Sequence, residues 1–190
     1  MYMDIFSFSD EELVTYIRDE NKEAFAHLID RYEKKLIRYI NYLVNDDEKA
    51  KDIVQETFIK VYINLNNFQV NKKFSSWVYR IAHNEAINLI NKEKKLVNFD
   101  TTNLLNELVS TFKKQEEVIF EEELVNDLKE VLTSIDSKYK DILVLYLLEQ
   151  KGYEEISEIL RIPTSTVGTR IKRGKTQVKN LLKQKGYGRY

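Results

Sequence analysis

The sequence contains no cysteine, one proline and two histidines among its 190 residues. The absence of cysteine excludes disulfides, thiolate metal sites and cysteine nucleophiles. His27 and His83 lie far apart and form no HExxH-like pattern, so we interpret both as structural. We therefore predict no catalytic residue, no metal site and no cofactor.

Glycine is also scarce, because only five occur and none precedes Gly152. A long stretch almost without helix breakers indicates an all-α fold. The first residues, MYMDIFSFSDEEL, contain no basic segment and no long apolar run. We therefore expect neither a signal peptide nor a transmembrane anchor, and a cytoplasmic location.

The net charge of −1 hides an uneven distribution along the chain. Residues 1–25 carry seven acidic side chains against two basic ones, whereas residues 151–190 carry ten basic side chains against three acidic ones. The chain therefore has a basic pole at its C-terminal end. With 43% hydrophobic and 32% charged residues, we expect two compact helical modules.

Hydrophobic periodicity predicts the helices of the first module. Ser9 and Glu12 form a capping-box pattern that opens a short helix. Apolar residues at three- and four-residue steps predict one amphipathic helix over residues 22–44. The following Asn45, Asp46 and Asp47 end it and cap the next helix, and Ser75 or Ser76 can cap a further helix that runs to about residue 95.

The periodicity weakens after residue 95, and acidic residues gather over 96–122, which we interpret as a linker. From residue 123 the helical pattern returns, with Asp136 as a cap for the apolar stretch YKDILVLYLL. We expect Gly152 to end that helix, residues 153–160 to form a short helix, and residues 161–164 to form a turn.

The last predicted helix is one-sided, because TSTVGTRIKRGKTQVKNLLK (164–183) contains lysine and arginine but no acidic residue. Val167, Ile171, Gly174, Val178 and Leu181 mark its apolar face, so Thr169, Lys172, Arg173, Thr176 and Lys183 point away from the core. A short helix, a turn and a second helix with a basic outer face indicate a helix-turn-helix sized for the DNA major groove. The alternative is a solvated charge run, although such a face usually mixes both signs.

Two blocks of sequence resemble a known family. DIVQETFIKVYINL (52–65) and FQVNKKFSSWVYRIAHNEAINLINKEKK (68–95) resemble region two of bacterial sigma factors of the extracytoplasmic-function group, and AFAHLIDRYEKKLIRYINYLVND (24–46) resembles the helix before it. SIDSKYKDILVLYLLEQKGYEEISEILRIPTSTVGTRIKRGKTQVKNLLK (134–183) resembles region four. The resemblance implies a region-two domain over 1–95, the linker over 96–122 and a region-four domain over 123–190.

The resemblance implies three contact surfaces on region two and region four. The helix of residues 52–65 would dock on the coiled coil of the largest RNA polymerase subunit through Asp52, Gln55, Glu56, Phe58 and Tyr62. The melted strand of the −10 element would be bound by Phe68, Asn71, Lys72, Lys73, Phe74, Trp77, Arg80 and Asn84, a set that offers stacking rings, phosphate-neutralising cations and amides for base edges. From the residues alone, Phe74 and Trp77 can equally be core.

The third surface would bind the −35 element through Ser165, Thr166, Gly168, Thr169, Arg170, Lys172, Arg173 and Lys175. Gly168 departs from the family pattern, in which a long polar or basic residue is common, and it offers no side chain to a base. The family further implies the polymerase flap and promoter DNA as partners, and an anti-sigma factor that can be membrane-anchored.

The sequence therefore predicts a sigma factor without catalytic activity of its own. The alternative is a conventional helix-turn-helix regulator that binds duplex operators as a homodimer, but neither an obvious dimer helix nor a palindrome-reading geometry is evident. An enzyme such as a helical nuclease would need clustered carboxylates or a histidine-based site, and Asp46 and Asp47 are better explained as helix caps.

Overall fold

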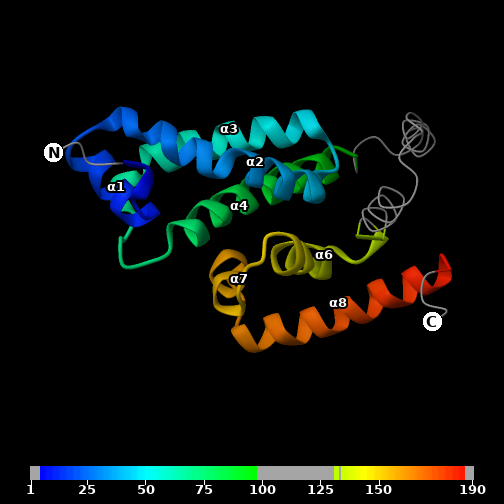
Figure 1. Ribbon diagram of the computed structural model, residues 1–190. Helices are drawn as coiled ribbons and strands as arrows, with labels where there is room; N and C mark the ends of the chain where they lie inside the picture. Colours follow the sequence, from blue (N-terminus) through cyan, green and yellow to red (C-terminus); the bar gives the residue numbers. More distant parts are fainter. Residues whose placement is uncertain (1–4, 98–130, 133, 187–190) are drawn as a thin grey trace.

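The computed structural model describes residues 5–97, 131–132 and 134–186. All regular structure within these residues is helical, which confirms the predicted all-α class. The helices form two bundles that lie side by side (Figure 1). The predicted linker, residues 96–122, lies almost wholly outside the described residues.

The first bundle contains four α-helices, α1 (Asp10–Asp19), α2 (Phe25–Val44), α3 (Asp47–Ile63) and α4 (Phe74–Val97). Short 3₁₀ turns precede or join them: η1 (Ile5–Ser7), η2 (Lys22–Ala24) and η3 (Leu65–Asn67). The predicted helix over 22–44 is therefore a 3₁₀ turn followed directly by α2. The core of this bundle is made of fully buried side chains from all four helices, among them Leu13, Ile17, Leu28, Leu36, Tyr39, Ile40, Val61, Phe74, Val78 and Tyr79.

Polar side chains set the ends of these helices. Ser9 and Glu12 form the predicted capping box at α1, where each side chain satisfies a backbone N–H of the other residue. Asn45 adopts a left-handed backbone (φ 55°) after α2, and Asp46 accepts the N–H groups of residues 48 and 49 at the start of α3. The predicted role of Asp46 as a cap is confirmed.

The predicted cap of α4 was wrong. Ser75 and Ser76 lie inside the helix, which begins at Phe74. The N–H of Phe74 donates to Glu11 Oε1 at 2.8 Å, so a carboxylate from α1 satisfies this end of the helix. A cap supplied by a distant residue leaves no signal in the local sequence.

The second bundle contains α6 (Ser137–Leu143), a π-helical turn η4 (Val144–Leu148), α7 (Tyr153–Leu160) and α8 (Thr164–Gln184). Asp136 caps α6 as predicted. Gly152 does not end the preceding helix, because its φ is −71° and it is the N-cap of α7, donating to Glu155. The left-handed residue that reverses the chain is Gln150 (φ 52°).

Close packing of α6 against α8 depends on the absence of a side chain at Gly174. A Cβ built there would lie 2.9 Å from Leu143 Cδ1, closer than real Cβ atoms approach, and 3.2 Å from Tyr139 Cβ, which is tighter than most real Cβ contacts. Val167, Ile171 and Val178 are buried on the same face. The apolar stripe predicted for the last helix is thus confirmed at these four positions.

Candidate functional site

The outward face of α3 combines acidic and apolar side chains. Its exposed members are Asp52, Gln55, Glu56, Ile59, Tyr62 and Ile63. Ile63 is 70% exposed and Ile59 is 53% exposed, although isoleucine is among the residues most often buried. An exposed apolar stripe beside carboxylates is typical of a surface that binds another protein.

One predicted member of this face does not belong to it. Phe58 is only 7% exposed, and its ring packs edge-on against Phe25 with centroids 6.4 Å apart. It lies on the inward stripe of α3 with Val54 and Val61, which makes it a core residue. The sequence reasoning missed Ile59 and Ile63, although they follow Glu56 at helical steps and could have been found from that spacing.

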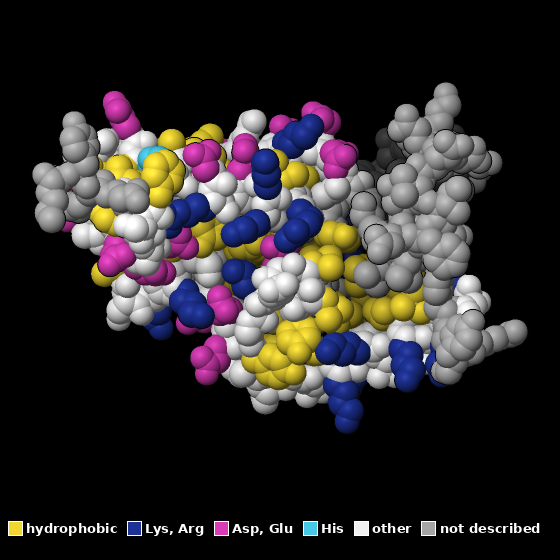
Figure 2. Space-filling model, viewed as in Figure 1, with side chains coloured by type: hydrophobic (Ala, Val, Ile, Leu, Met, Phe, Trp, Pro, Cys, Tyr) yellow, Lys and Arg dark blue, Asp and Glu magenta, His cyan; other side chains and the backbone are white. Residues whose placement is uncertain are grey.

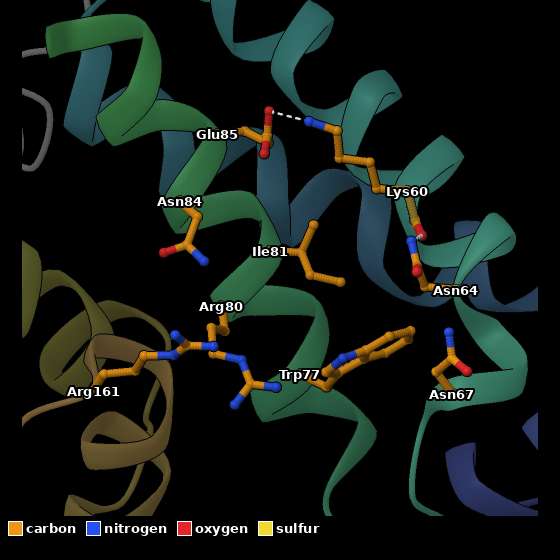
Figure 3. Close-up of a pocket in the computed structure, with 9 residues that line it drawn as sticks. All are labelled: Lys60, Asn64, Asn67, Trp77, Arg80, Ile81, Asn84, Glu85 and Arg161. Carbon is orange, nitrogen blue, oxygen red and sulfur yellow. Dashed lines mark hydrogen bonds and ion pairs between the residues drawn. The ribbon is translucent and has the colours of Figure 1, made fainter.

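A hollow of about 340 Å³ lies between α3 and α4 and reaches the second bundle (Figure 3). It is lined by Lys60, Asn64, Asn67, Trp77, Arg80, Ile81, Asn84, Glu85 and Arg161. Trp77, Arg80 and Asn84 were predicted from the sequence, and the structure brings these three together. An indole face, amides and guanidinium groups in one hollow can stack on a base, bond its edge and neutralise a phosphate.

Two predicted stacking residues are part of the core. Phe74 is 0% exposed and Phe68 is 5% exposed, so neither presents a ring face to a base in this conformation. Their rings pack edge-on at 5.6 Å, and Trp77 lies over both, 5.1 Å from Phe68 and 5.8 Å from Phe74. The half-buried Trp77 is therefore the ring of the three that a base can stack on, and Phe68 and Phe74 pack against its buried side.

A side chain of α1, Arg18, holds the backbone of residues 65–68 beside the hollow. Arg18 Nε donates to the carbonyl of Leu65 at 3.0 Å, and its Nη2 donates to the carbonyls of Leu65 and Phe68. These bonds join positions 47 and 50 residues apart. A hydrogen bond to a charged donor contributes about 1.5–3 kcal/mol, so Arg18 is a strong anchor for the loop that the sequence did not reveal.

The remaining predicted polar residues of this surface are accessible. Asn71, Lys72 and Lys73 are exposed in the loop before α4, and Asn84 is exposed on α4. Arg80 is half-buried, and burial together with the nearby Arg161 lowers its pKa. A guanidinium stays charged despite such a shift, and its surroundings favour an anion beside it.

The helix-turn-helix geometry of the second bundle is present. The turn between α7 and α8 consists of Arg161, with a left-handed backbone (φ 53°), followed by Ile162 and Pro163. Ser157 Oγ donates to the carbonyl of Ile162 at 2.6 Å and so holds the turn on α7. α8 begins at Thr164, the residue that was predicted to end the turn.

The outward face of α8 has the predicted composition. Thr169, Lys172, Arg173, Thr176 and Lys183 are all exposed, as are Ser165 and Lys175, whereas Thr166 and Arg170 are half-buried. On the face shown in Figure 2, Lys and Arg side chains follow α8 and no acidic side chain lies among them. This positively charged surface is complementary to the negatively charged phosphates of DNA.

Two residues of this helix have additional contacts. A Cβ at Gly168 would touch only the ring of Tyr153, at 3.4 Å, so this glycine is half-buried against α7 rather than open to solvent. Lys175 Nζ lies 4.5 Å from the centroid of the Tyr146 ring, a cation–π contact that holds its side chain along the helix.

Other kinds of site find no support among the described residues. They contain no group of three or more histidine and acidic side chains arranged to hold a metal ion. The helices described here also lack the length and apolarity needed to cross a membrane.

Comparison with known proteins identifies both bundles. The family model "Sigma-70 region 2" matches residues 28–96, and the model "Sigma-70, region 4" matches residues 126–178. The chain is 30% identical over 177 residues to the "ECF RNA polymerase sigma factor SigW" of Bacillus subtilis, covering 90% of this chain and 95% of that protein. It is 28% identical over 180 residues to the "RNA polymerase sigma-H factor" of Pseudomonas aeruginosa, covering 91% and 93%.

Solved structures share the fold. CnrH, solved in complex with the cytosolic domain of CnrY, superimposes with a TM-score of 0.71 at 19% identity and covers 92% of this chain and 97% of that one. The sigma factor RpoE of Bartonella quintana, solved with the anti-sigma factor NepR, gives a TM-score of 0.68 at 19% identity and covers 84% and 96%.

Proposed function

Because the chain belongs to the extracytoplasmic-function sigma factors and thus directs promoter-specific initiation by RNA polymerase, we propose that its three surfaces divide this work. The α3 face docks on core polymerase, the hollow beside α4 takes the melted −10 strand, and α8 enters the −35 duplex. The domains that carry these surfaces span residues 1–95 and 123–190, joined by 96–122. The observation that carries the proposal is the acid-free outer face of α8 directly after the α7 turn.

The α3 face suits a protein partner rather than DNA. Carboxylates at Asp52 and Glu56 would repel phosphate, and the exposed Ile59, Tyr62 and Ile63 would lose contact with water on docking. Burial of apolar surface contributes about 25 cal/mol per Å², so even a narrow stripe adds substantially to binding. The largest polymerase subunit is the partner that we assign to this face.

Docking is tested by co-elution with core polymerase. Asp52→Lys with Glu56→Lys should abolish co-elution, because both carboxylates are exposed. The variant should still fold, since the ion pair of Glu56 with Lys60, at 3.4 Å, is an exposed one that contributes little to stability. Ile63→Ala should weaken it, whereas Val70→Ala, which shortens a 46%-exposed apolar residue elsewhere, should not. Undiminished binding of the double variant would refute the docking assignment.

Strand capture is supported by the hollow around Trp77. Bases stack on an exposed aromatic face with an energy of about 1–3 kcal/mol, and nearby lysines neutralise the phosphates. Asn84→Ala, or Lys72→Ala with Lys73→Ala, should weaken binding of single-stranded −10 oligonucleotides in the holoenzyme. If −35 duplex binding falls equally, the substitutions act through folding instead.

We further propose a regulatory partner and a location. RpoE was solved with the anti-sigma factor NepR, and CnrH with the cytosolic domain of CnrY, which supports an anti-sigma factor for this chain. The chain acts in the cytoplasm, where polymerase and promoters are found, and has no catalytic activity of its own. Transcription from genomic promoter fragments with added core polymerase tests the whole assignment, because a conventional repressor would not initiate transcription.

A further inference from the structure

The loop between η3 and α4, residues 69–73, has no buried side chain of its own. All five residues are exposed, and one backbone bond inside the loop, from the Lys72 N–H to the Gln69 carbonyl at 2.9 Å, forms a turn. We call this segment the strand-binding loop. A loop without buried apolar contacts takes its shape from the points at which its two ends are attached.

Both ends of the strand-binding loop are attached to one helix, α1, which lies beside it (Figure 1). At the first end, Arg18 donates to the carbonyls of Leu65 and Phe68. At the second end, Glu11 Oε1 accepts the N–H of Phe74 at 2.8 Å. Each contact joins a charged side chain to a backbone group, and such hydrogen bonds are roughly twice as strong as neutral ones.

The spacing of Glu11 and Arg18 limits the shape that the loop can take. They are seven residues apart, which places them on one face of α1, two turns from each other. At 1.5 Å per residue, this separation is about 10 Å along the helix axis. The six steps from Phe68 to Phe74 could span about 20 Å if they were extended. The loop therefore cannot run straight between its attachments and must bulge toward solvent.

α1 is itself held firmly on the bundle. The apolar side chains of its inner face are buried: Leu13, Val14 and Ile17. Asp10 accepts a hydrogen bond from Arg31 Nη1 at 2.8 Å and another from the Tyr32 hydroxyl, and both donors belong to α2. Because α1 cannot shift without breaking these contacts, its two charged side chains hold the loop ends at fixed positions.

The shape of the strand-binding loop decides the shape of a second hollow, of about 450 Å³. Its walls include Gln69 and Lys72 of the loop, Trp77 and Arg80 of α4, and Glu158 of α7. A polar side chain discriminates between bases only where it lies within hydrogen-bond distance of a base edge. A displacement of about 1 Å is enough to lose such a contact, so selectivity requires a loop that is held in place.

We infer that α1 is a template for the strand-binding loop, in which Glu11 and Arg18 are positioning residues that determine how strictly the loop selects one base. The inference rests on the proposed −10 assignment of this surface. The carboxylate of Glu11 would repel a phosphate, so its effect on the strand is exerted through the backbone of Phe74. Base selection therefore depends on two side chains that act through the loop and not by contact with DNA.

Base selectivity in the holoenzyme tests the template. The probe is a single strand of about 12 nucleotides, selected by the wild-type holoenzyme from a random-sequence library, together with its single-base variants. Glu11→Ala and Arg18→Met should each reduce the discrimination against the weakest-binding variant by about three- to tenfold, because one end of the loop is released. Co-elution with core polymerase should not change, since the docking face of α3 is untouched. Reduced co-elution would place the effect on docking and overturn the inference.

Two matched variants distinguish positioning from a general loss of stability. Glu11→Gln keeps an oxygen that accepts the Phe74 N–H, so it should retain the discrimination that Glu11→Ala loses. Glu12→Ala removes the capping-box contact to the Ser9 N–H, which weakens α1 without touching the loop. It should lower the free energy of unfolding and leave the discrimination as in the wild type. Equal loss in Glu11→Ala and Glu12→Ala, or no rescue by glutamine, would contradict the template.

Hydrogen exchange of the free chain gives an independent measurement. The N–H groups of Phe68 and Lys72 donate to backbone carbonyls at 3.1 and 2.9 Å, and both should exchange faster in Glu11→Ala and in Arg18→Met than in the wild type. The double variant should lose less discrimination than the product of the two single effects, because a loop released at one end is already displaced. Unchanged exchange in both variants, or effects that multiply fully, would show that the two residues do not share one loop.

The outcomes separate this inference from the proposed function. If Lys72→Ala with Lys73→Ala weakens strand binding but the α1 variants leave the discrimination intact, the template is refuted and the strand site stands. If the lysine variant has no effect on strand binding in the holoenzyme, the −10 assignment itself fails. Faster exchange of the loop in the α1 variants would then still support α1 as the template that sets the shape of the loop.

Discussion

Gly174 provides a sharp test of how α6 and α8 are held together. In Gly174→Ala, the new methyl group would lie 2.9 Å from Leu143 Cδ1, 3.1 Å from Leu143 Cγ and 3.2 Å from Tyr139 Cβ. Leu143 is fully buried and Tyr139 nearly so, and a Cβ atom cannot move without its backbone. The two helices must therefore shift apart to admit a single methyl group.

Two opposing effects determine the size of the change. Overpacking a well-filled core costs about 1–3 kcal/mol, whereas alanine is favoured over glycine inside a helix by about 1 kcal/mol. We expect a net loss of about 1 kcal/mol in the free energy of unfolding. Gly168→Ala is the matched control, because its methyl group would meet only the Tyr153 ring at an ordinary 3.4 Å. It should stabilise the chain by about 0.5–1 kcal/mol.

Urea unfolding followed by circular dichroism measures both variants. Hydrogen exchange of peptides from α8 should show faster exchange in Gly174→Ala and slower exchange in Gly168→Ala. Fluorescence of Trp77, the sole tryptophan, reports the first bundle separately. If both alanines change the stability in the same direction, close approach to α6 is not the reason for glycine at position 174.

Three further predictions concern pH, base recognition and the loop before α4. Burial lowers the pKa of His83 to about 4, so between pH 6.5 and 4 the unfolded chain binds a proton that the folded chain does not. The free energy of unfolding should therefore decrease by up to about 3 kcal/mol as the pH is lowered from 6.5 to 4. Urea unfolding at several pH values measures this dependence, and His83→Gln should lose it. Arg173→Ala should weaken promoter binding by about 1–3 kcal/mol and relax specificity at one −35 position. Lys175→Ala should weaken binding to all sequences alike and lower the slope of the salt dependence of binding by about one unit. Footprinting on single-base promoter variants at several salt concentrations separates the two effects. Arg18→Met should weaken −10 strand binding in the holoenzyme without changing co-elution with core polymerase, because it removes the donors that fix the carbonyls of Leu65 and Phe68.

Local signals in the sequence predicted much of the fold. The capping box of α1 and the Asp46 and Asp136 caps act within three residues of the helix they open, so they can be recognised from sequence alone. The apolar face of α8 likewise follows from helical spacing, and this spacing placed Thr169, Lys172 and Arg173 on the exposed side. Elements with a strong period and nearby caps are therefore predictable.

The errors share a different cause. Ser75 and Ser76 looked like caps because the true partner of the Phe74 N–H, Glu11, lies 63 residues earlier. Phe68 follows the η3 turn and Phe74 begins α4, and both looked available for stacking because periodicity does not tell whether a ring at the end of an element faces solvent or the core. Such features are set by tertiary contacts, and a single sequence carries no direct record of them.

The same distinction explains why the packing of the two bundles was not predicted from the sequence. Glu155 and Glu158 appear in the sequence as ordinary solvated charges of a short helix, and their partners lie some 80 residues away. The lysines of these ion pairs, Lys72 and Lys73, are more than half exposed, so each pair contributes only about 0.2–1 kcal/mol. Glu149 is almost fully buried and accepts hydrogen bonds from Arg38 and Tyr79, so it fixes the geometry with which the two bundles pack.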